Sequence, residues 1–343
     1  MSRKLASINL IDSLKPIPGA DFIELAVIKG WQCVVKKGEF QAGDLCVYFE
    51  IDSLLPEIPA FEFLRKSVKV KTMPLEGKEY TGFRLRTMRF KGELSQGLCL
   101  PLSVFPELTD VHLGDDVTEI LNIMKYEPPA VSGGHFVSIG LFPSFVSKTD
   151  EERIQNIPEI LEHLQSKQVV MTEKIDGASA TYYLDPETDA LHCCSRNLDI
   201  ADGDNIYWNA SRIYPIETAL RELKTQHGKG FAIQGELTGP NIQANPYKQN
   251  RLRFFVFNVF DMDTRRNVFS PFKNFPMLGS LESVPVVYQG IYQGQTVSEL
   301  LETAKGKSQL AEVIREGLVI RLDEGDRWLS FKVVNNDFLL NEK

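Results

Sequence analysis

A lysine in the second half of the sequence stands where a strand-like apolar run, QVVMTEK, ends. Lys174 closes this run, and the pair Asp176 and Gly177 favours a tight turn directly behind it. A lysine held in such a turn can act as a nucleophile when nearby cations or desolvation lower the pKa of its amine. The same residues also suit an ordinary surface lysine before a hairpin, so the assignment depends on the motifs in later segments of the chain.

Four charged motifs come after this lysine, and each adjoins an apolar stretch. They are SRN with Arg196 and Asn197, GEL with Glu236, EGLVIR with Glu316, and SFKV with Lys332. Two of these motifs, GEL and EGLVIR, supply the carboxylates of Glu236 and Glu316. A solvated residue at a strand end remains the alternative for each of these two glutamates.

This order of motifs resembles that of the covalent nucleotidyltransferases, a superfamily of ATP-dependent RNA ligases, DNA ligases and mRNA capping guanylyltransferases. The resemblance extends over about residues 170–334. It implies that Lys174 attacks the α-phosphorus of ATP and becomes a lysyl-AMP while pyrophosphate leaves. It also implies a Mg²⁺ or Mn²⁺ cofactor, held through water by Asp176, Glu236 and Glu316, with Glu236 also contacting the ribose.

The resemblance assigns phosphate contacts to three further residues. Arg196 and Asn197 would contact ribose and phosphate, although Arg-Asn turns are also common on exposed surfaces. In WLSFKVV, polar and apolar residues alternate, which places Ser330 and Lys332 on one polar face. Lys332 would then reach the α-phosphate, stabilise the transition state and help to lower the pKa of Lys174. Many family members carry Lys-x-Lys here, and Ser330 departs from that pattern.

Two residues are expected to recognise the base. The family pattern nominates Phe257, in the apolar run FFVFNVF, as the ring that stacks on adenine, while core packing is the alternative for the same residue. Glu173 precedes the nucleophile, and its carboxylate can accept a hydrogen bond from the adenine amino group but would face the O6 acceptor of guanine. This residue therefore favours ATP over GTP.

The N-terminal third predicts a β-rich module. Strand-like stretches occur at Trp31–Val35, Leu45–Ile51, Gly82–Phe90 and Gly97–Leu100, with turns between them. We expect a small barrel, with the oligonucleotide-binding (OB) type as one candidate, over residues 1–125, followed by a linker at 126–145, which the segment KYEPPAVSGGHF (125–136) indicates. Basic and aromatic residues mix from Arg65 to Lys91, which favours an RNA-binding β-ribbon, although basic residues also protect edge strands from aggregation.

The remainder, residues 146–343, is predicted to be an α+β adenylyltransferase domain with antiparallel sheets and flanking helices. Strands are expected at Phe254–Phe260, Gly317–Leu322 and Trp328–Val334, and helices near Pro215–Leu223 and Val297–Ala304. The stretch SKTDEERIQNIPEILEHLQS carries acidic residues at its start and apolar residues at helical spacing, which favours a helix there.

The position of the β-rich module distinguishes among the members of the superfamily. DNA ligases and capping enzymes place an OB domain after the last motif, and the few residues beyond Lys332 leave no room for one. With GWQCVVKKGEFQAGDLCVYFEID and FPSFVSKTDEERIQN, the chain resembles RNA ligases that carry an N-terminal OB module. The resemblance implies that AMP passes to an RNA 5′-phosphate and that a 3′-hydroxyl then displaces it. Expected partners are RNA ends in a nicked or splinted duplex, and the expected enzyme is a monomer.

Composition limits the alternatives. The chain has 343 residues, 43% of them apolar and 24% charged, which excludes disorder and coiled coil. No apolar run approaches the roughly 20 residues of a membrane span and no secretory signal begins the chain, so we expect an intracellular protein with reduced cysteines. The net charge of -8 argues against coating of nucleic acid by bulk charge. A DNA or mixed-duplex ligase, a GTP-dependent capping enzyme and a noncatalytic RNA-binding protein remain the alternatives.

Overall fold

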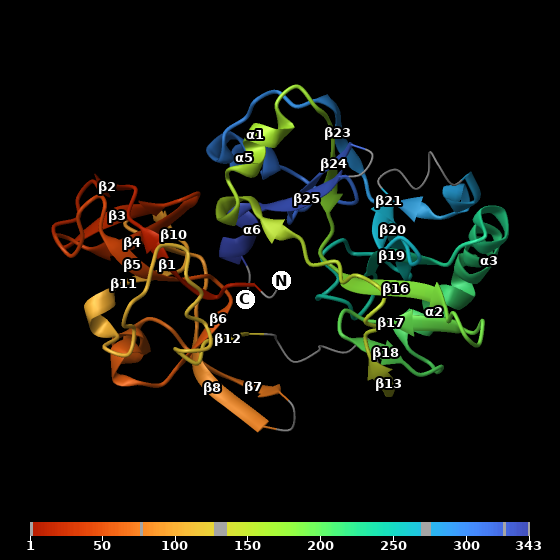
Figure 1. The fold of residues 1–343 in the computed structure, drawn as a ribbon, viewed down its shortest axis with the longest axis horizontal. Coiled ribbons are helices and arrows are strands. Elements are labelled where there is room, and N and C mark those ends of the chain that lie inside the picture. The colour runs from red at the N-terminus through yellow and green to blue at the C-terminus, as the bar shows by residue number, and fades with distance from the viewer. Residues whose placement is uncertain (1–2, 76–77, 127–135, 269–275, 325–326, 342–343) are drawn as a thin grey trace. The chain divides into compact units, whose positions relative to one another are not determined.

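The chain divides into two compact units in the computed structural model (Figure 1), which describes residues 3–75, 78–126, 136–268, 276–324 and 327–341. The first unit comprises Met1–Ala130, Ile154–Pro158 and Leu339–Lys343, and the second comprises Val131–Arg153 and Glu159–Phe338. Of the linker expected at 126–145, residues 127–135 lie outside the described residues. No helix in the described ranges has both the length and the apolar character needed to span a membrane.

Short antiparallel strands build the first unit. In order of pairing, the sheets are β1 (Ala6–Leu10), β5 (Leu45–Phe49) and β11 (Leu98–Pro101); β2 (Ser13–Pro16), β3 (Ile23–Ile28) and β4 (Trp31–Lys36); β12 (Met124–Lys125), β6 (Ser53–Pro56), β8 (Lys78–Arg84) and β7 (Val70–Leu75); and β9 (Met88–Phe90) with β10 (Glu93–Ser95). The 3-10 helices η1 (Pro59–Lys66) and η2 (Leu102–Val104) complete it. Across the described residues the pairing does not close into one ring, so the expected barrel is present as OB-like sheets without full closure.

An aromatic core holds these sheets together. The rings of Phe49 and Phe61 meet edge to face with their centroids 5.2 Å apart, and Phe105 lies 5.8 Å from Phe49. All three side chains are buried, as is Phe83 from β8. Edge-to-face packing suits the charge distribution of aromatic rings and adds to the free energy gained by burying their area. The apolar positions of the alternating strands therefore face inward, as the sequence predicts.

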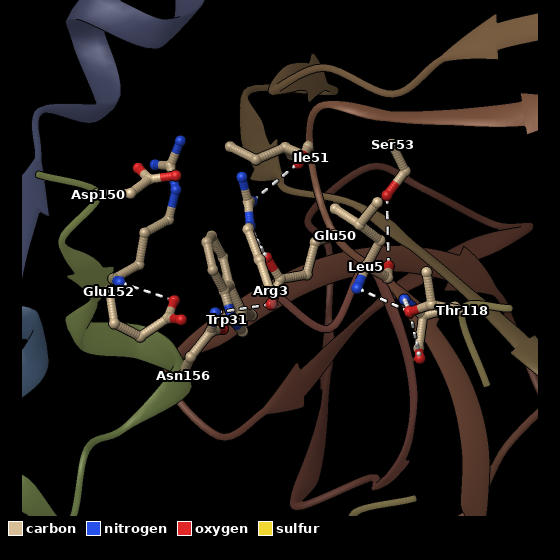
Figure 2. Close-up of polar contacts among 12 residues, drawn as sticks. Arg3, Leu5, Trp31, Glu50, Ile51, Ser53, Thr118, Asp150, Glu152 and Asn156 are labelled. Carbon is tan, nitrogen blue, oxygen red and sulfur yellow. Dashed lines mark hydrogen bonds and ion pairs between the residues drawn. The ribbon is translucent and has the colours of Figure 1, made fainter. Parts of the chain in front are cut away.

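The short segment Ile154–Pro158 belongs to the first unit through buried polar contacts, shown in Figure 2. The Trp31 indole Nε1 donates to Asn156 Oδ1 at 2.6 Å, and Asn156 Nδ2 donates to Glu50 Oε1 at 2.6 Å. The other oxygen of Glu50 accepts from Arg3 Nε at 2.6 Å. Trp31 is 1% exposed and Glu50 is 4% exposed, so a residue far along the chain supplies hydrogen bonds that this buried site needs.

The second unit contains two larger sheets. The first is eight-stranded and runs β13 (Ser138–Leu141), β18 (Leu198–Ile200), β17 (Leu191–Cys194), β16 (Ala178–Leu184), β19 (Phe231–Thr238), β20 (Arg253–Asp261) and β21 (Arg266–Val268), with β22 (Glu282–Ser283) beside β20. Helices α2 (Ile206–Ile213) and α3 (Ile216–His227) pack on it, and Asn205 caps α2. Ile216, Leu220 and Leu223 of α3 lie at helical spacing in the core that the strands share.

The second sheet carries the ends of several predicted motifs. It is five-stranded and runs β14 (Glu152–Arg153), β25 (Arg327–Val334), β24 (Gly317–Glu324), β15 (Gln168–Lys174) and β23 (Val286–Ile291). Helix α5 (Val297–Ala304) lies against β25 and begins at a capping box formed by Thr296 and Glu299. The shorter helices are α1 (Ile160–Leu164), α6 (Asn336–Asn341), η3 (Ile154–Asn156) and η4 (Pro276–Ser280). The predicted α+β fold class is confirmed.

The helix expected over SKTDEERIQNIPEILEHLQS is wrong for most of its length. Only Ile160–Leu164 is α-helical, whereas Glu152 and Arg153 form β14, which pairs in parallel with Phe331 and Lys332 of β25. Pro158 interrupts a helix that would start earlier, because proline lacks the amide hydrogen of a helix interior. Pairing with β25 therefore overrides the local helical pattern, and it places Glu152 and Arg153 beside Phe331 and Lys332.

Candidate active site

The register of β15 and β24 brings the predicted lysine beside a predicted glutamate. Lys174 is paired with Gly317, so Glu316 stands next to the end of β15. Lys174 Nζ donates to Glu316 Oε1 at 2.6 Å, and the two side chains are 28% and 15% exposed. A Cβ at Gly317 would lie 2.3 Å from the carbonyl oxygen of Val333, so only glycine allows this approach of β24 to β25.

Glu236 reaches the same lysine from the other sheet. It lies on β19 opposite Ser179 of β16, the strand that follows the Asp176-Gly177 turn. A Cβ at Gly177 would lie 2.3 Å from the carbonyl oxygen of Leu237 and 2.8 Å from Cγ of Glu236. The turn behind Lys174 therefore packs directly on the strand that carries Glu236, and a larger residue would push the two apart.

The electrostatics of Lys174 differ from the sequence-based expectation. Burial alone would lower the pKa of Lys174, but the carboxylates of Glu316, Glu236 and Asp176 outweigh burial and raise that pKa above its ordinary value. No cation overcomes these carboxylates among the described residues, although the sequence predicts that cations lower the pKa. The amine is therefore held as an ammonium ion, and it must lose a proton before it can attack.

Glu236 shows the opposite perturbation. Burial raises the pKa of Glu236 to about 8, with Glu316 adding to the rise and Lys174 opposing it. Near neutral pH this carboxyl is largely protonated in the absence of a further positive charge. Crowding of carboxylates around one ammonium thus leaves the cluster with more acidic groups than Lys174 alone can neutralise.

This cluster has the chemistry of a hydrated cation site. Oε2 of Glu316 is buried and has no hydrogen-bond partner within the described part of the chain. Oxygen donors of this kind suit Mg²⁺ or Mn²⁺. No group of three or more His, Cys, Asp or Glu side chains that could ligate an ion directly occurs among the described residues. The donor set therefore fits a cation that retains its waters.

Tyr247 supports the turn behind Lys174, and sequence reasoning missed it. Its hydroxyl accepts a hydrogen bond from the main-chain N–H of Asp176 at 2.8 Å, and the residue is 5% exposed. Gln243 Nε2 donates to the carbonyl oxygen of Gly177 at 3.2 Å. The loop that carries both has several non-glycine residues with positive φ, among them Asn241 at 63° and Ala244 at 55°. Such backbone is unfavourable and is retained where the surroundings impose it; no sequence periodicity signals it.

A β-bulge lies at Phe257, next to the buried phenylalanines of β20. On β19, Gln234 pairs with Asn258 and the next residue, Gly235, pairs with Val256, so Phe257 is left between them. Bulges re-aim a side chain beside functional sites. Phe257 is half-buried and packs against a cluster that contains Ile175 and the buried Phe255, whereas Phe254 is buried in the other core cluster of the unit.

Glu173 points to the opposite face of β15 from Lys174, as strand alternation requires. Its Oε2 accepts from the main-chain N–H of Gln309 at 2.8 Å, while its Oε1 is buried without a partner among the described residues. Leu310, next to Gln309, packs on the same cluster as Phe257. Glu173 is thus not grouped with the carboxylates around Lys174; it lies beside the loop that adjoins Phe257.

Two of the three predicted phosphate-contacting residues, Arg196 and Lys332, meet at one carboxylate that sequence reasoning had not singled out. Arg196 and Asn197 form the turn between β17 and β18, and Lys332 lies on β25. Asp150 accepts from Arg196 Nη2 at 2.5 Å and from Lys332 Nζ at 3.4 Å. Asn197 Oδ1 accepts from Lys148 Nζ at 2.9 Å. The structure therefore brings cations from both sheets together.

Ser330 lies across from a buried cation on the same face as Lys332. The register pairs Ser330 with Arg321, and Lys332 with Val319 two residues earlier. Arg321 is 5% exposed, and its Nη1 donates to Thr172 Oγ1 at 2.8 Å. Positive charge thus remains next to Ser330, although the residue itself carries none.

The basic stretch of the first unit divides into buried and exposed parts. Arg84 is 8% exposed, bonds to Asp52 at 3.0 Å and lies over the Tyr126 ring, so it serves the fold. The exposed lysines of the stretch are Lys66, Lys69, Lys71, Lys78 and Lys91. The expected continuous strand from Gly82 to Phe90 is also wrong, because β8 ends at Arg84 and β9 begins at Met88.

Comparisons with known proteins agree with this arrangement. An OB-fold domain model matches residues 5–102, and an RNA ligase family model matches residues 167–334. A search of curated proteins gives no match. Among solved structures, the Naegleria gruberi RNA ligase with PPi is 37% identical, with 98% of each chain covered and a TM-score of 0.88. A mutant of that ligase with ATP and Mn is 36% identical, with the same coverage of both chains and a TM-score of 0.88.

Proposed function

The chain belongs to the RNA ligase family, and from this premise we propose that it seals RNA ends through a lysyl-AMP formed at Lys174. The observation that carries the proposal is the 2.6 Å contact of Lys174 Nζ with Glu316, inside the group of carboxylates that also includes Glu236 and Asp176. An amine in this position is a half-buried nucleophile with acidic groups around it. A binding protein would not need such a costly grouping of charges.

In the first step, Lys174 Nζ bonds to the α-phosphorus of ATP, the bond from that phosphorus to the bridging oxygen breaks, and pyrophosphate leaves. Before this attack, the ammonium gives its proton to solvent. Asp176, Glu236 and Glu316 would hold Mg²⁺ or Mn²⁺ through water, and such an ion would supply positive charge that favours this loss and offsets charge on the phosphates. The relatives solved with ATP and Mn support this requirement.

We assign recognition of the adenine to Phe257 and Glu173. The bulge leaves Phe257 without a paired residue on β19, which allows its ring to be re-aimed so that it can stack on a base. The unpartnered Oε1 of Glu173 can accept a hydrogen bond from an adenine amino group and would repel the O6 of guanine. Both residues lie against the loop that contains Gln309 and Leu310, which supports one shared pocket for the base.

Contacts with ribose and phosphate are assigned to Arg196, Asn197, Glu236 and Lys332. Arg196 can hold phosphate oxygens with its forked guanidinium, and Lys332 can neutralise the α-phosphate in the transition state. In the second step an oxygen of the RNA 5′-phosphate attacks the phosphorus of the lysyl-AMP, and the P–N bond to Lys174 breaks. In the third step a 3′-hydroxyl attacks the 5′-phosphate and AMP leaves. Arg196 and Lys332 would serve each step, because each transition state carries negative charge on phosphate oxygens that these cations can stabilise.

We further propose that the substrate is a nicked or splinted duplex and that the enzyme acts as a monomer. The exposed lysines of the first unit, including Lys69, Lys71 and Lys78, support contact with a strand backbone, because neutralisation of phosphates drives such binding. Every residue assigned to the nucleotide comes from one unit of one chain. Light scattering of the purified enzyme checks the monomer.

Sealing of a labelled, singly nicked RNA duplex tests the substrate. Lys69→Ala with Lys71→Ala and Lys78→Ala should weaken sealing and lower the salt dependence of binding by a slope of about 0.9 per lost phosphate contact. Lysyl-AMP formation should be unchanged. The control replaces the exposed Lys15 and Lys37 of the same unit. Equal sealing by the two variants, or better sealing of unpaired strands than of the nick, would contradict the proposed substrate.

A further inference from the structure

The stretch Lys148–Arg153 contacts the β17–β18 turn and β25, which carry the predicted phosphate ligands, and also β16 and β24. Besides Lys148 on Asn197, Thr149 Oγ1 lies 3.2 Å from Ser179 Oγ, and Glu151 lies 4.0 Å from Arg321. Asp150 stands in the middle, and its two oxygens hold different cations: Oδ2 holds Arg196 and Oδ1 holds Lys332. Arg196 belongs to the eight-stranded sheet and Lys332 to the five-stranded sheet, so one carboxylate bridges the two.

We propose that Asp150 is a positioning residue that serves as an internal substitute for phosphate: it holds Arg196 and Lys332 together in the ATP-free enzyme and releases them when the triphosphate binds. A carboxylate presents two oxygens with negative charge, the same chemistry that phosphate oxygens offer to a guanidinium and an ammonium. The cations are thereby kept near each other at a time when they would otherwise repel. This inference rests on the proposed roles of Arg196 and Lys332.

The exposure of the bridge explains why it can be exchanged. The Asp150 side chain is 47% exposed and that of Arg196 is 44% exposed, so solvent screens their attraction. Lys332 is only 14% exposed and lies at the longer distance of 3.4 Å from Asp150. A polyphosphate brings several negative charges, so it can displace a single, screened carboxylate. The more buried pair of Lys174 and Glu316 is less open to such exchange.

The chain contains a matched control elsewhere in the same unit. Asp189 also bridges an arginine and a lysine, with Arg221 at 2.7 Å and Lys224 at 2.6 Å, and it is 50% exposed. Both of its cations lie on α3 and neither is assigned to the nucleotide. Asp189→Asn therefore removes the same kind of bridge without touching the phosphate-binding residues.

Calorimetric titration of the full-length, ATP-free enzyme with inorganic pyrophosphate, at low ionic strength and without divalent cations, tests the inference. Asp150→Asn keeps the size of the side chain and removes its charge. We expect its Kd for pyrophosphate to fall at least about threefold, because the competing anion is gone, and the gain to shrink as salt is added. Asp150→Glu, which restores the carboxylate, should return the Kd toward that of wild type. The apparent KM for ATP should fall in the same ratio, with the maximal adenylation rate within about twofold of wild type.

Several results would overturn the inference. An unchanged or higher Kd in Asp150→Asn shows that the carboxylate does not compete with phosphate, and a loss of maximal rate with no change in KM shows a merely structural role. An equal gain in Glu152→Gln, which removes the charge two residues away, assigns the effect to general electrostatics. Asp189→Asn should match wild type. If the wild-type enzyme binds no pyrophosphate, the assignment of Arg196 and Lys332 to phosphate is refuted. If the enzyme does not form lysyl-AMP, the proposed function is refuted, but the result of this titration still stands.

Discussion

The hydrogen bond between Tyr247 and the turn behind Lys174 offers a sharp test of how the nucleophile is positioned. Tyr247→Phe keeps the ring in its packed cluster and removes only the hydroxyl, which accepts from the main-chain N–H of Asp176 at 2.8 Å. Asp176 is two residues from Lys174, and its carboxylate is assigned to the cation. The variant should therefore loosen the turn without emptying the space that the side chain fills.

The expected size depends on the cost of leaving that N–H without its partner. An unpaired buried donor costs about 1–3 kcal/mol. If the whole loss is felt in the transition state, adenylation slows about 5- to 150-fold. Burial raises the pKa of Tyr247 well above its ordinary value, so the hydroxyl stays neutral and the ratio of the two rates should not change between about pH 6 and 9.

The assay is single-turnover formation of labelled lysyl-AMP from α-labelled ATP, together with urea unfolding of each variant. Tyr182→Phe is the control, because its hydroxyl donates to the carbonyl oxygen of Tyr207 at 2.9 Å in the core and touches no assigned site residue. Both variants should lose similar stability, and only Tyr247→Phe should be slow. Equal adenylation rates in the two variants, or a rate ratio that changes with pH, would refute the positioning role.

Three further outcomes are expected. Asn156→Ala should lower the free energy of unfolding by about 2–4 kcal/mol, because it breaks the hydrogen bonds with Trp31 and Glu50. Urea unfolding measures this free energy, and a loss below about 1 kcal/mol contradicts the prediction. In the metal-free enzyme, the raised pKa of Lys174 keeps its amine protonated, so trace acetylation of Lys174 should be slow near neutral pH and should rise as the pH rises. Glu316→Gln removes the ion pair and should speed this acetylation about tenfold at a given pH. Peptide mass spectrometry measures both rates, and equal rates refute the role of the ion pair. Glu173→Gln should narrow the preference for ATP over GTP about tenfold in label transfer, and an unchanged preference removes Glu173 from base recognition.

The strands that carry the site could be predicted because their residues alternate or form apolar runs. The run ending at Lys174 is β15, and the run after Glu316 is β24, as the sequence pattern indicates. The pairing of Lys174 with Gly317, which makes Glu316 a direct neighbour, depends on strand register between segments far apart in the chain. Local patterns carry no information about that register.

Three features lay beyond sequence reasoning for physical reasons. The pKa of Lys174 moves upward because carboxylates from three segments surround it. The size of their combined electrostatic effect depends on distances in the folded chain. Tyr247 stands in a loop of left-handed backbone without a periodic signal. Asp150 looked like the acidic start of a helix, whereas pairing of its neighbours with β25 places it between Arg196 and Lys332.

The segment around Asn156 also bears on how the chain should be divided for experiments. A cut near residue 125 separates Trp31 and Glu50 from the hydrogen bonds that Asn156 supplies. Their burial makes that loss costly to the isolated module. Substitutions in the full chain are therefore the sounder way to test the role of the first unit.

The most direct test of the central claim is to incubate the enzyme with α-labelled ATP and Mg²⁺ and to map the labelled peptide by mass spectrometry. We predict AMP joined to Nζ of Lys174, no label with Lys174→Ala, and normal label with Lys305→Ala, a control lysine at the end of α5. AMP attached to any other residue, or label that persists in Lys174→Ala, would contradict the assignment of Lys174 as the nucleophile.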